Sequence, residues 1–204
     1  MFDKFIWQKR NALSPNFCDA LIAKFEADDN KEQGITGGGL NPKFKISTDL
    51  NLSVWDAYQY EDEVLFESIK TGINEYCAYH RTLHPVLDMQ NNPHVELEDS
   101  GYQMQRTRVG EYYKWHNDFG IYKNGVRLAT YIWYLNDVHK GGETEFIDGT
   151  LIKPEQGKLM IFPAYWNYHH QGRPPISNTK YIVTGWMVVD PVLEMKKYKD
   201  GTLE

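Results

Sequence analysis

The sequence has few cysteines, no long apolar run and no cluster of positive charge. Its 204 residues include only Cys18 and Cys77, both in helix-like patterns, which indicates core residues in a reducing compartment rather than disulfides. No segment reaches the ~20 apolar residues that span a bilayer, and the first residues do not resemble a signal peptide. A net charge of −6 without a basic stripe argues against nucleic-acid binding. We therefore expect a cytoplasmic protein with no membrane and no nucleic-acid partner.

Aromatic residues and closely spaced turns are abundant instead. Aromatic residues make up 14% of the chain, a composition that suits a β-sheet core or a cleft lined with rings. Strand-like segments run from Val95 to Val189 and are separated by glycine-containing turns at 123–125, 140–142, 148–149 and 155–157. The sequence therefore predicts a mainly β fold with supporting α-helices, whose core is a double-stranded β-helix (jelly roll).

The N-terminal half has two helix-like segments separated by a glycine-rich stretch. The first begins at Ser14, a helix N-cap, with Pro15 at the first helical position. The second spans 61–80, and we expect its apolar stripe to pack against the outside of the sheet. Between them, 32–55 lacks periodicity, which predicts either a binding loop or a disordered surface segment. The length predicts one domain, with a frayed tail beyond Pro191.

Three residues have the pattern of a metal site. His116 and Asp118 are two apart in a strand-like segment, so their side chains point to one face and can hold one ion. This pair alone is weak evidence, but His170 supplies a third candidate ligand ahead of a strand that begins at Lys180. Two imidazoles and one carboxylate that leave coordination positions open are the facial triad of non-haem Fe(II) oxygenases. A Zn(II) hydrolase with the same ligands and a non-catalytic jelly-roll binding domain are the alternatives.

The order of the motifs resembles a known enzyme family. The motifs are His116-x-Asp118, the segment 127–136, Gly141-Gly142-Glu143-Thr144-x-Phe146, the segment 154–162, and His170 with Lys180 ten residues later. Together they resemble the 2-oxoglutarate and Fe(II)-dependent oxygenases, specifically the prolyl 4-hydroxylase-like branch, in detail over 101–189. The segment 43–50 resembles the substrate-side loop of the family. The resemblance implies a single Fe(II)/2-oxoglutarate dioxygenase domain over 1–204, with helical support and the substrate-side loop in 1–94 and the jelly-roll catalytic core in 95–190.

The resemblance also implies roles for single residues. Fe(II) would be held by His116, Asp118 and His170, and the motif around His170 selects it over its neighbour His169. Lys180 would bind the distal carboxylate of 2-oxoglutarate, because a buried lysine needs an anionic partner, and a solvated strand end is the alternative for it. The Thr130 hydroxyl would help Lys180 to bind this distal carboxylate, and Trp186 would lie near the cosubstrate end. Tyr113 and Arg127 would lie near the substrate, and Thr107 stands in place of a family tyrosine that contributes to the cosubstrate pocket.

Hydroxylation is the activity that the resemblance implies. The cosubstrates 2-oxoglutarate and O2 are converted to succinate and carbon dioxide while a C–H bond gains a hydroxyl group, with ascorbate as a further cofactor. Asp118 favours hydroxylation, because halogenating relatives have a small residue at that position. Peptidyl proline is the expected substrate, and a free amino acid or another small molecule is the alternative. The sequence leaves the oligomeric state open.

Overall fold

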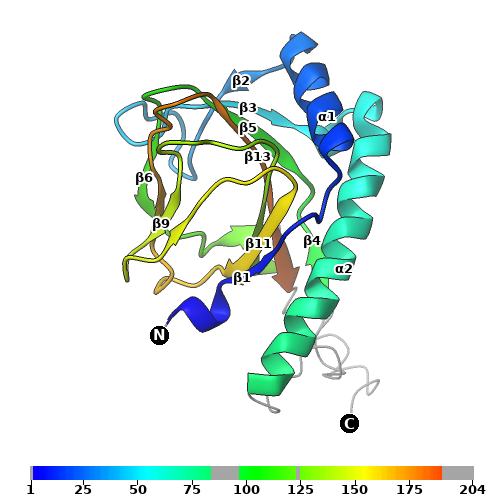
Figure 1. The fold of residues 1–204 in the computed structure, drawn as a ribbon, viewed down its shortest axis with the longest axis vertical. Helices are drawn as coiled ribbons and strands as arrows, with labels where there is room; N and C mark the ends of the chain where they lie inside the picture. The colour runs from blue at the N-terminus through cyan, green and yellow to red at the C-terminus, as the bar shows by residue number, and fades with distance from the viewer. Residues whose placement is uncertain (1, 84–96, 123–124, 190–204) are drawn as a thin grey trace.

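The computed structural model describes residues 2–83, 97–122 and 125–189. Within them, two antiparallel sheets face each other as a jelly roll, and both helices lie beside the larger sheet (Figure 1). The predicted mainly β fold with supporting α-helices is confirmed. The predicted strand start at Val95, the turn positions 123–124 and the tail beyond Pro191 lie outside the described residues.

The larger sheet has nine strands, in the order β1-β11-β8-β13-β5-β3-β2, with β4 paired to β13 and β7 paired to β8. Its strands are β1 (Trp7–Lys9), β2 (Glu32–Gln33), β3 (Thr48–Asn51), β4 (Leu97–Asp99), β5 (Gln103–Thr107), β7 (Ile121–Tyr122), β8 (Gly125–Tyr134), β11 (Lys158–Pro163) and β13 (Lys180–Val189). The smaller sheet has four short strands, in the order β10-β9-β12-β6. They are β6 (Tyr113–His116), β9 (Thr144–Phe146), β10 (Leu151–Ile152) and β12 (His170–Gly172).

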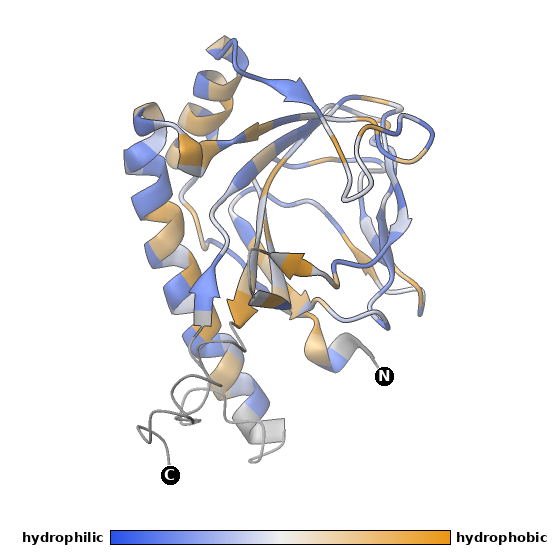
Figure 2. Ribbon diagram, turned by 180° about the vertical axis from the view of Figure 1, so that it is seen from behind, coloured by the Kyte–Doolittle hydropathy of each residue, from blue (hydrophilic) through white to orange (hydrophobic). Residues whose placement is uncertain are grey.

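Two α-helices cover the outer face of the larger sheet. In α1 (Pro15–Ala27) the Ser14 hydroxyl accepts a hydrogen bond from the Phe17 backbone N–H at 3.3 Å, so the predicted cap is confirmed. The second predicted helix is α2 (Gln59–Leu83), along which hydrophobic and hydrophilic positions alternate (Figure 2). Among the described residues, no helix is both long and apolar enough to cross a membrane. The apolar stripe of α2 is buried, as predicted, and consists of Leu65, Ile69, Ile73, Tyr76 and Cys77.

Strand β8 separates two hydrophobic clusters, because its side chains alternate between the faces of the sheet. Tyr131 and Trp133 point outward into the cluster under the helices, where the Trp133 indole donates to the Ser68 hydroxyl at 3.0 Å. Ile132 and Tyr134 point inward into the cluster between the sheets. The even-numbered positions of β8 therefore face the interior of the jelly roll, which is the arrangement that brings this strand to the site.

The segment 32–55 is more ordered than its sequence indicates. It contains β2 and β3, and β3 joins the larger sheet beside β5. Two short 3-10 helices follow, Leu52–Val54 and Asp56–Tyr58, while a third, Phe2–Phe5, precedes β1. The strand pattern is hidden because the buried positions of this segment are partly polar: Lys45, Ser47 and Asp49 are buried and satisfy one another.

Candidate metal centre and cavity

The three predicted metal ligands meet at one edge of the smaller sheet. His116 ends β6, Asp118 follows two residues later, and His170 begins β12 as the Cα partner of His116. One candidate ligand atom from each residue lies within 4.8 Å of the other two. The Nε2 atoms of His116 and His170 are 3.8 Å and 3.7 Å from the oxygens of Asp118. The structure thus brings together the three residues that the sequence selected from two distant segments.

Backbone carbonyls fix the orientation of both imidazoles. The Nδ1 atom of His116 is 2.7 Å from the carbonyl oxygen of Lys114, and that of His170 is 3.0 Å from the carbonyl oxygen of Tyr168. With Nδ1–H donating to these carbonyls, each Nε2 presents its lone pair to the centre, as metal-ligating histidines require. His169 points elsewhere, with its Nε2 3.4 Å from the Asn117 amide nitrogen. The preference for His170 over His169 therefore agrees with the geometry.

The charge states of His116 and Asp118 suit a divalent cation. Burial, aided by the neighbouring His170, lowers the pKa of His116 to about 3. Burial raises the pKa of the Asp118 carboxyl, but the two histidines and the Thr130 hydroxyl outweigh this effect and lower it overall. Neutral imidazole and ionised carboxylate are the forms that bind metals. Two nitrogen donors and one oxygen donor with an open side fit Fe(II), the metal of the facial triad.

A cavity of about 420 Å³ adjoins the three ligands. This volume lies within the ~300–1,000 Å³ range of small-molecule sites. Its wall includes Lys180 at one end of β13 and Trp186 farther along the same strand, with Arg127 and Tyr113 also exposed to it. All four of these predicted site residues therefore line the same cavity as the metal ligands.

Lys180 is buried inside this cavity, as predicted. Its side chain is 5% exposed, and its ammonium group donates a hydrogen bond to the Gly142 carbonyl oxygen at 3.0 Å. Burial lowers the pKa of this ammonium to about 8, although Glu143 raises it in part. A Cβ atom added at Gly172 would lie 3.5 Å from the ammonium nitrogen, so the glycine leaves room beside it. A buried ammonium group that faces a cavity and donates to a neutral backbone carbonyl is a binding point for an anion.

The structure corrects the assignment of Thr130 to the distal carboxylate of 2-oxoglutarate. Thr130 is the Cα partner of Trp186, six residues along β13 from Lys180, which is about 20 Å at ~3.3 Å per residue. Its hydroxyl instead donates to the Asp118 carboxylate at 2.8 Å. The hydroxyl groups placed near Lys180 by the strand pairing are those of Thr107, its Cα partner on β5, and Thr144, the Cα partner of Gly172. Thr107, which stands in place of the family tyrosine, therefore lies beside Lys180.

Two aromatic stacks border the metal centre. The Tyr113 ring lies on the His116 ring with a centroid separation of 3.5 Å and an interplanar angle of 12°. The Arg127 guanidinium lies 3.6 Å from the centroid of the Trp186 ring. All four residues of the two stacks line the cavity. The substrate roles of Tyr113 and Arg127 and the cosubstrate role of Trp186 remain predictions.

Sequence reasoning missed a buried ion pair at the cavity wall. The Lys45 ammonium is 2.7 Å from the Asp49 carboxylate, which also accepts from the Ser47 hydroxyl at 2.8 Å. The same ammonium lies 5.1 Å from the centroid of the Tyr113 ring. Burial raises the pKa of Asp49, although Lys45 and Ser47 oppose it. A signal was present, because lysine, serine and aspartate at alternate positions share one face of a strand.

Comparison with known proteins supports the same assignment. The family model of the 2OG-Fe(II) oxygenase superfamily matches residues 102–188. Probable prolyl 4-hydroxylase 8 of Arabidopsis thaliana is 43% identical over a match that covers 90% of this chain and 70% of that protein. Probable prolyl 4-hydroxylase 4 of the same plant is 30% identical over 125 residues, and this match spans 43% of this chain and only 41% of the relative.

Solved structures share the fold. A viral collagen prolyl hydroxylase from Paramecium Bursaria Chlorella virus-1, in a 2OG complex, has a TM-score of 0.62 at 22% identity, over 90% of this chain and 96% of that chain. A prolyl hydroxylase from Trichoplax adhaerens, in complex with a hypoxia inducible factor peptide fragment, has a TM-score of 0.69 at 13% identity, over 94% and 86%. By its match to probable prolyl 4-hydroxylase 8 and to the family model, and with the triad in its cavity, the chain belongs to the 2-oxoglutarate and Fe(II)-dependent oxygenases, in their prolyl 4-hydroxylase-like branch.

Proposed function

We propose that this chain is a 2-oxoglutarate-dependent dioxygenase that hydroxylates an unactivated C–H bond. In this reaction, 2-oxoglutarate and O2 are consumed, and succinate, carbon dioxide and the hydroxylated substrate are released. The single observation that carries the proposal is the buried Lys180 ammonium in the same cavity as the triad. A Zn(II) hydrolase would need the triad alone, whereas a dicarboxylic cosubstrate needs both features.

Each part of the cavity has a distinct task in this proposal. His116, Asp118 and His170 hold Fe(II), which supplies the redox chemistry that activates dioxygen when it is bound. Lys180 binds the distal carboxylate of 2-oxoglutarate by a charge-assisted hydrogen bond. Thr130 holds the Asp118 carboxylate in place. Lys180 and His170 are both buried, and burial strengthens the electrostatic contacts that they make.

Peptidyl proline is the substrate that we propose. The relatives are named as prolyl 4-hydroxylases, and one solved neighbour holds a peptide fragment. The wall of the cavity includes apolar side chains that suit a pyrrolidine ring, namely Ile35, Phe119 and Trp186, of which Ile35 and Phe119 are more than half exposed. We further propose that ascorbate acts as a reductant for the iron and that the protein is cytoplasmic.

The test is product analysis with the Fe(II)-loaded chain. Proline-containing peptides and a panel of free amino acids and metabolites are incubated with 2-oxoglutarate, and succinate is measured together with the gain of one oxygen atom in mass. Oxygen on a peptidyl proline supports the full proposal. Oxygen on a free amino acid keeps the dioxygenase and replaces the substrate, and an absence of succinate under all conditions contradicts the dioxygenase itself.

A further inference from the structure

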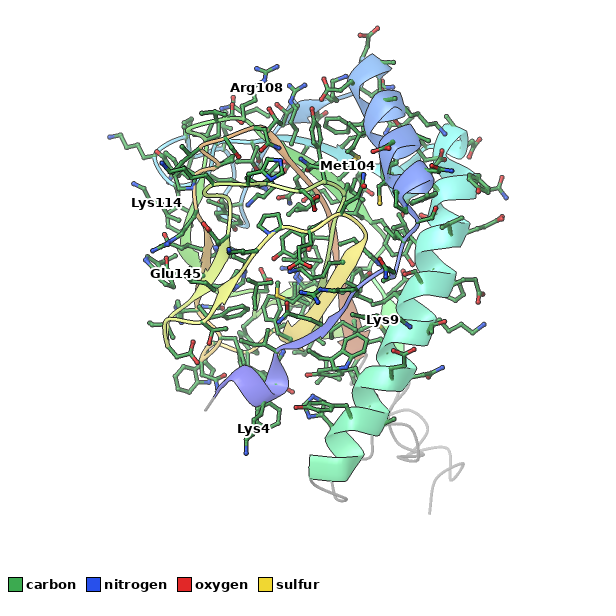
Figure 3. All side chains as sticks on the ribbon, viewed as in Figure 1. Lys4, Lys9, Met104, Arg108, Lys114 and Glu145 are labelled. Carbon is green, nitrogen blue, oxygen red and sulfur yellow. The ribbon has the colours of Figure 1, made fainter. Side chains whose placement is uncertain are left out.

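A polar cluster lies on the outer face of the smaller sheet, and we call it the β12 clamp: Glu145, Gln171 and Arg173. One carboxylate oxygen of Glu145 accepts hydrogen bonds from the Gln171 amide and from the Arg173 Nε atom, both at 2.7 Å. Its other oxygen accepts from the Arg173 Nη2 atom at 3.2 Å. Figure 3 shows Glu145 on the side of the molecule away from the two helices. Although the cluster is near the surface, only 17% of the Glu145 side chain is exposed.

The clamp lies directly behind two residues of the cavity. Strand β12 is three residues long, and Gln171, its central residue, is the Cα partner of Glu145. Because side chains alternate along a strand, His170 and Gly172 point to the opposite face, toward the metal centre and Lys180. Both residues line the cavity. The outward contacts of Gln171 and Arg173 therefore help to set the positions of His170 and Gly172.

A strand this short needs help to keep its register. A shift by one residue would exchange the two faces, replacing His170 at the metal centre by a neighbour. The pairing of β12 with β6 is irregular between His170 and Gly172, whereas its pairing with β9 is regular over all three residues. The clamp reinforces the β9 register, because Glu145 accepts hydrogen bonds from the residues on both sides of Gly172, and a bidentate guanidinium contact is sensitive to geometry. A slip would also place a side chain where Gly172 leaves room for the Lys180 ammonium.

We propose that Glu145 is a positioning residue, which fixes β12 so that His170 reaches the metal and Gly172 leaves the cosubstrate pocket open. This inference rests on the proposed dioxygenase function. The Glu145 carboxylate would then affect the binding of both the metal and 2-oxoglutarate, although it contacts neither of them.

The test compares Glu145→Ala with a matched control, Glu155→Ala. Glu155 also accepts from two cationic side chains, Arg10 at 2.8 Å and Lys158 at 3.2 Å, but it precedes β11 in the larger sheet. For each protein, three quantities are measured: the Co(II) affinity and absorption spectrum of the metal-free chain, the KM and kcat for 2-oxoglutarate, and the melting temperature. We expect Glu145→Ala to lose about tenfold in Co(II) affinity, to change the spectrum and to raise KM. Glu155→Ala should change only the melting temperature.

Two further variants complete the design. Glu145→Gln keeps an oxygen that accepts from Arg173 and should recover part of both losses. Arg173→Gln removes the bidentate guanidinium contact but leaves the Glu145 carboxylate, so it tests the clamp even if Glu145→Ala does not fold. It should cause smaller changes in Co(II) affinity, spectrum and KM, in the same direction. A normal Co(II) spectrum and KM in folded Glu145→Ala or Arg173→Gln would overturn the inference. A wild-type chain that binds no Co(II) would instead overturn the proposed function, so the two failures are distinguishable.

Discussion

The two sheets meet at one cavity but hold their functional residues in different ways. The smaller sheet presents the metal ligands from β6 and β12, strands of four and three residues, at positions where regular pairing ends. The larger sheet presents Lys180 and Thr130 from β13 and β8, strands of ten residues each that lie side by side in its middle. The outer face of these long strands is covered by the helices. The positions of the predicted metal ligands therefore depend on short strands and a few local hydrogen bonds, whereas Lys180 belongs to a long strand paired on both sides.

The largest expected effect lies in the smaller sheet, where neighbouring histidines have opposite roles. His170→Ala should abolish turnover and metal binding while the fold survives. The imidazole packs against Phe146 and Phe162 of the inner cluster, but the larger cluster under the helices does not include these residues. His169→Ala is the matched control and should retain the metal. Metal content and succinate formation are measured for both proteins. Loss of metal in His169→Ala with retention in His170→Ala would reverse the assignment.

Lys180 tests the larger sheet separately from the metal. A charge-assisted hydrogen bond contributes about 1.5–3 kcal/mol, so Lys180→Ala should raise the apparent 2-oxoglutarate requirement at least about tenfold. Its Fe(II) affinity should stay nearly unchanged, because the lysine is not a ligand. Lys180→Arg should retain more function than Lys180→Ala without matching the wild type, because a planar guanidinium presents its donors differently. Succinate formation is followed against 2-oxoglutarate concentration, and an identical curve for Lys180→Ala would remove the lysine from the pocket.

The same contrast explains what the sequence could predict. The short spacing of His116 and Asp118 and the inward position of Lys180 could both be predicted, because each depends on a pattern within a single segment. The strand that alternation assumed for the first pair ends at His116, and Asp118 lies just beyond it. The helix start at Ser14 and the buried stripe of α2 are local in the same sense. Such features do not require knowledge of which strands are neighbours.

Pairing between strands could not be predicted from one sequence. Thr130 shares a face with the interior residues, as predicted, but its distance from Lys180 depends on the register between β8 and β13. The segment 32–55 was missed for another reason, because its buried face is a polar network rather than an apolar stripe. The clamp on β12 combines both difficulties, since its members come from two strands and are all polar.

Thr130→Val changes a residue of the larger sheet that contacts Asp118, one of the predicted metal ligands. The substitution preserves the shape but removes the hydrogen bond to Asp118. Contacts of this type typically contribute about 10–100-fold in metal affinity or activity. We expect weaker Co(II) binding with an unchanged 2-oxoglutarate KM at saturating metal, which is the reverse of the Lys180→Ala result. Thr184→Val is the control, because its hydroxyl donates to the Tyr131 carbonyl rather than to a ligand. An effect on the KM for 2-oxoglutarate alone would indicate that Thr130 contacts the cosubstrate.

The smallest expected effect is the pH dependence of cosubstrate capture, which follows from the buried ammonium. Burial lowers the pKa of Lys180 in the free protein to about 8, so the charged form that binds a dicarboxylate predominates below pH 8 and is lost as the pH rises through that value. The ratio kcat/KM for 2-oxoglutarate reports groups of the free enzyme. From pH 7 to pH 8.5 it should fall about fourfold, the loss expected for a single group with this pKa. The guanidinium of Lys180→Arg does not titrate in this range, so that variant should show a flat profile at a lower level. A fall of equal size in Lys180→Arg would assign the titration to another group of the metal centre.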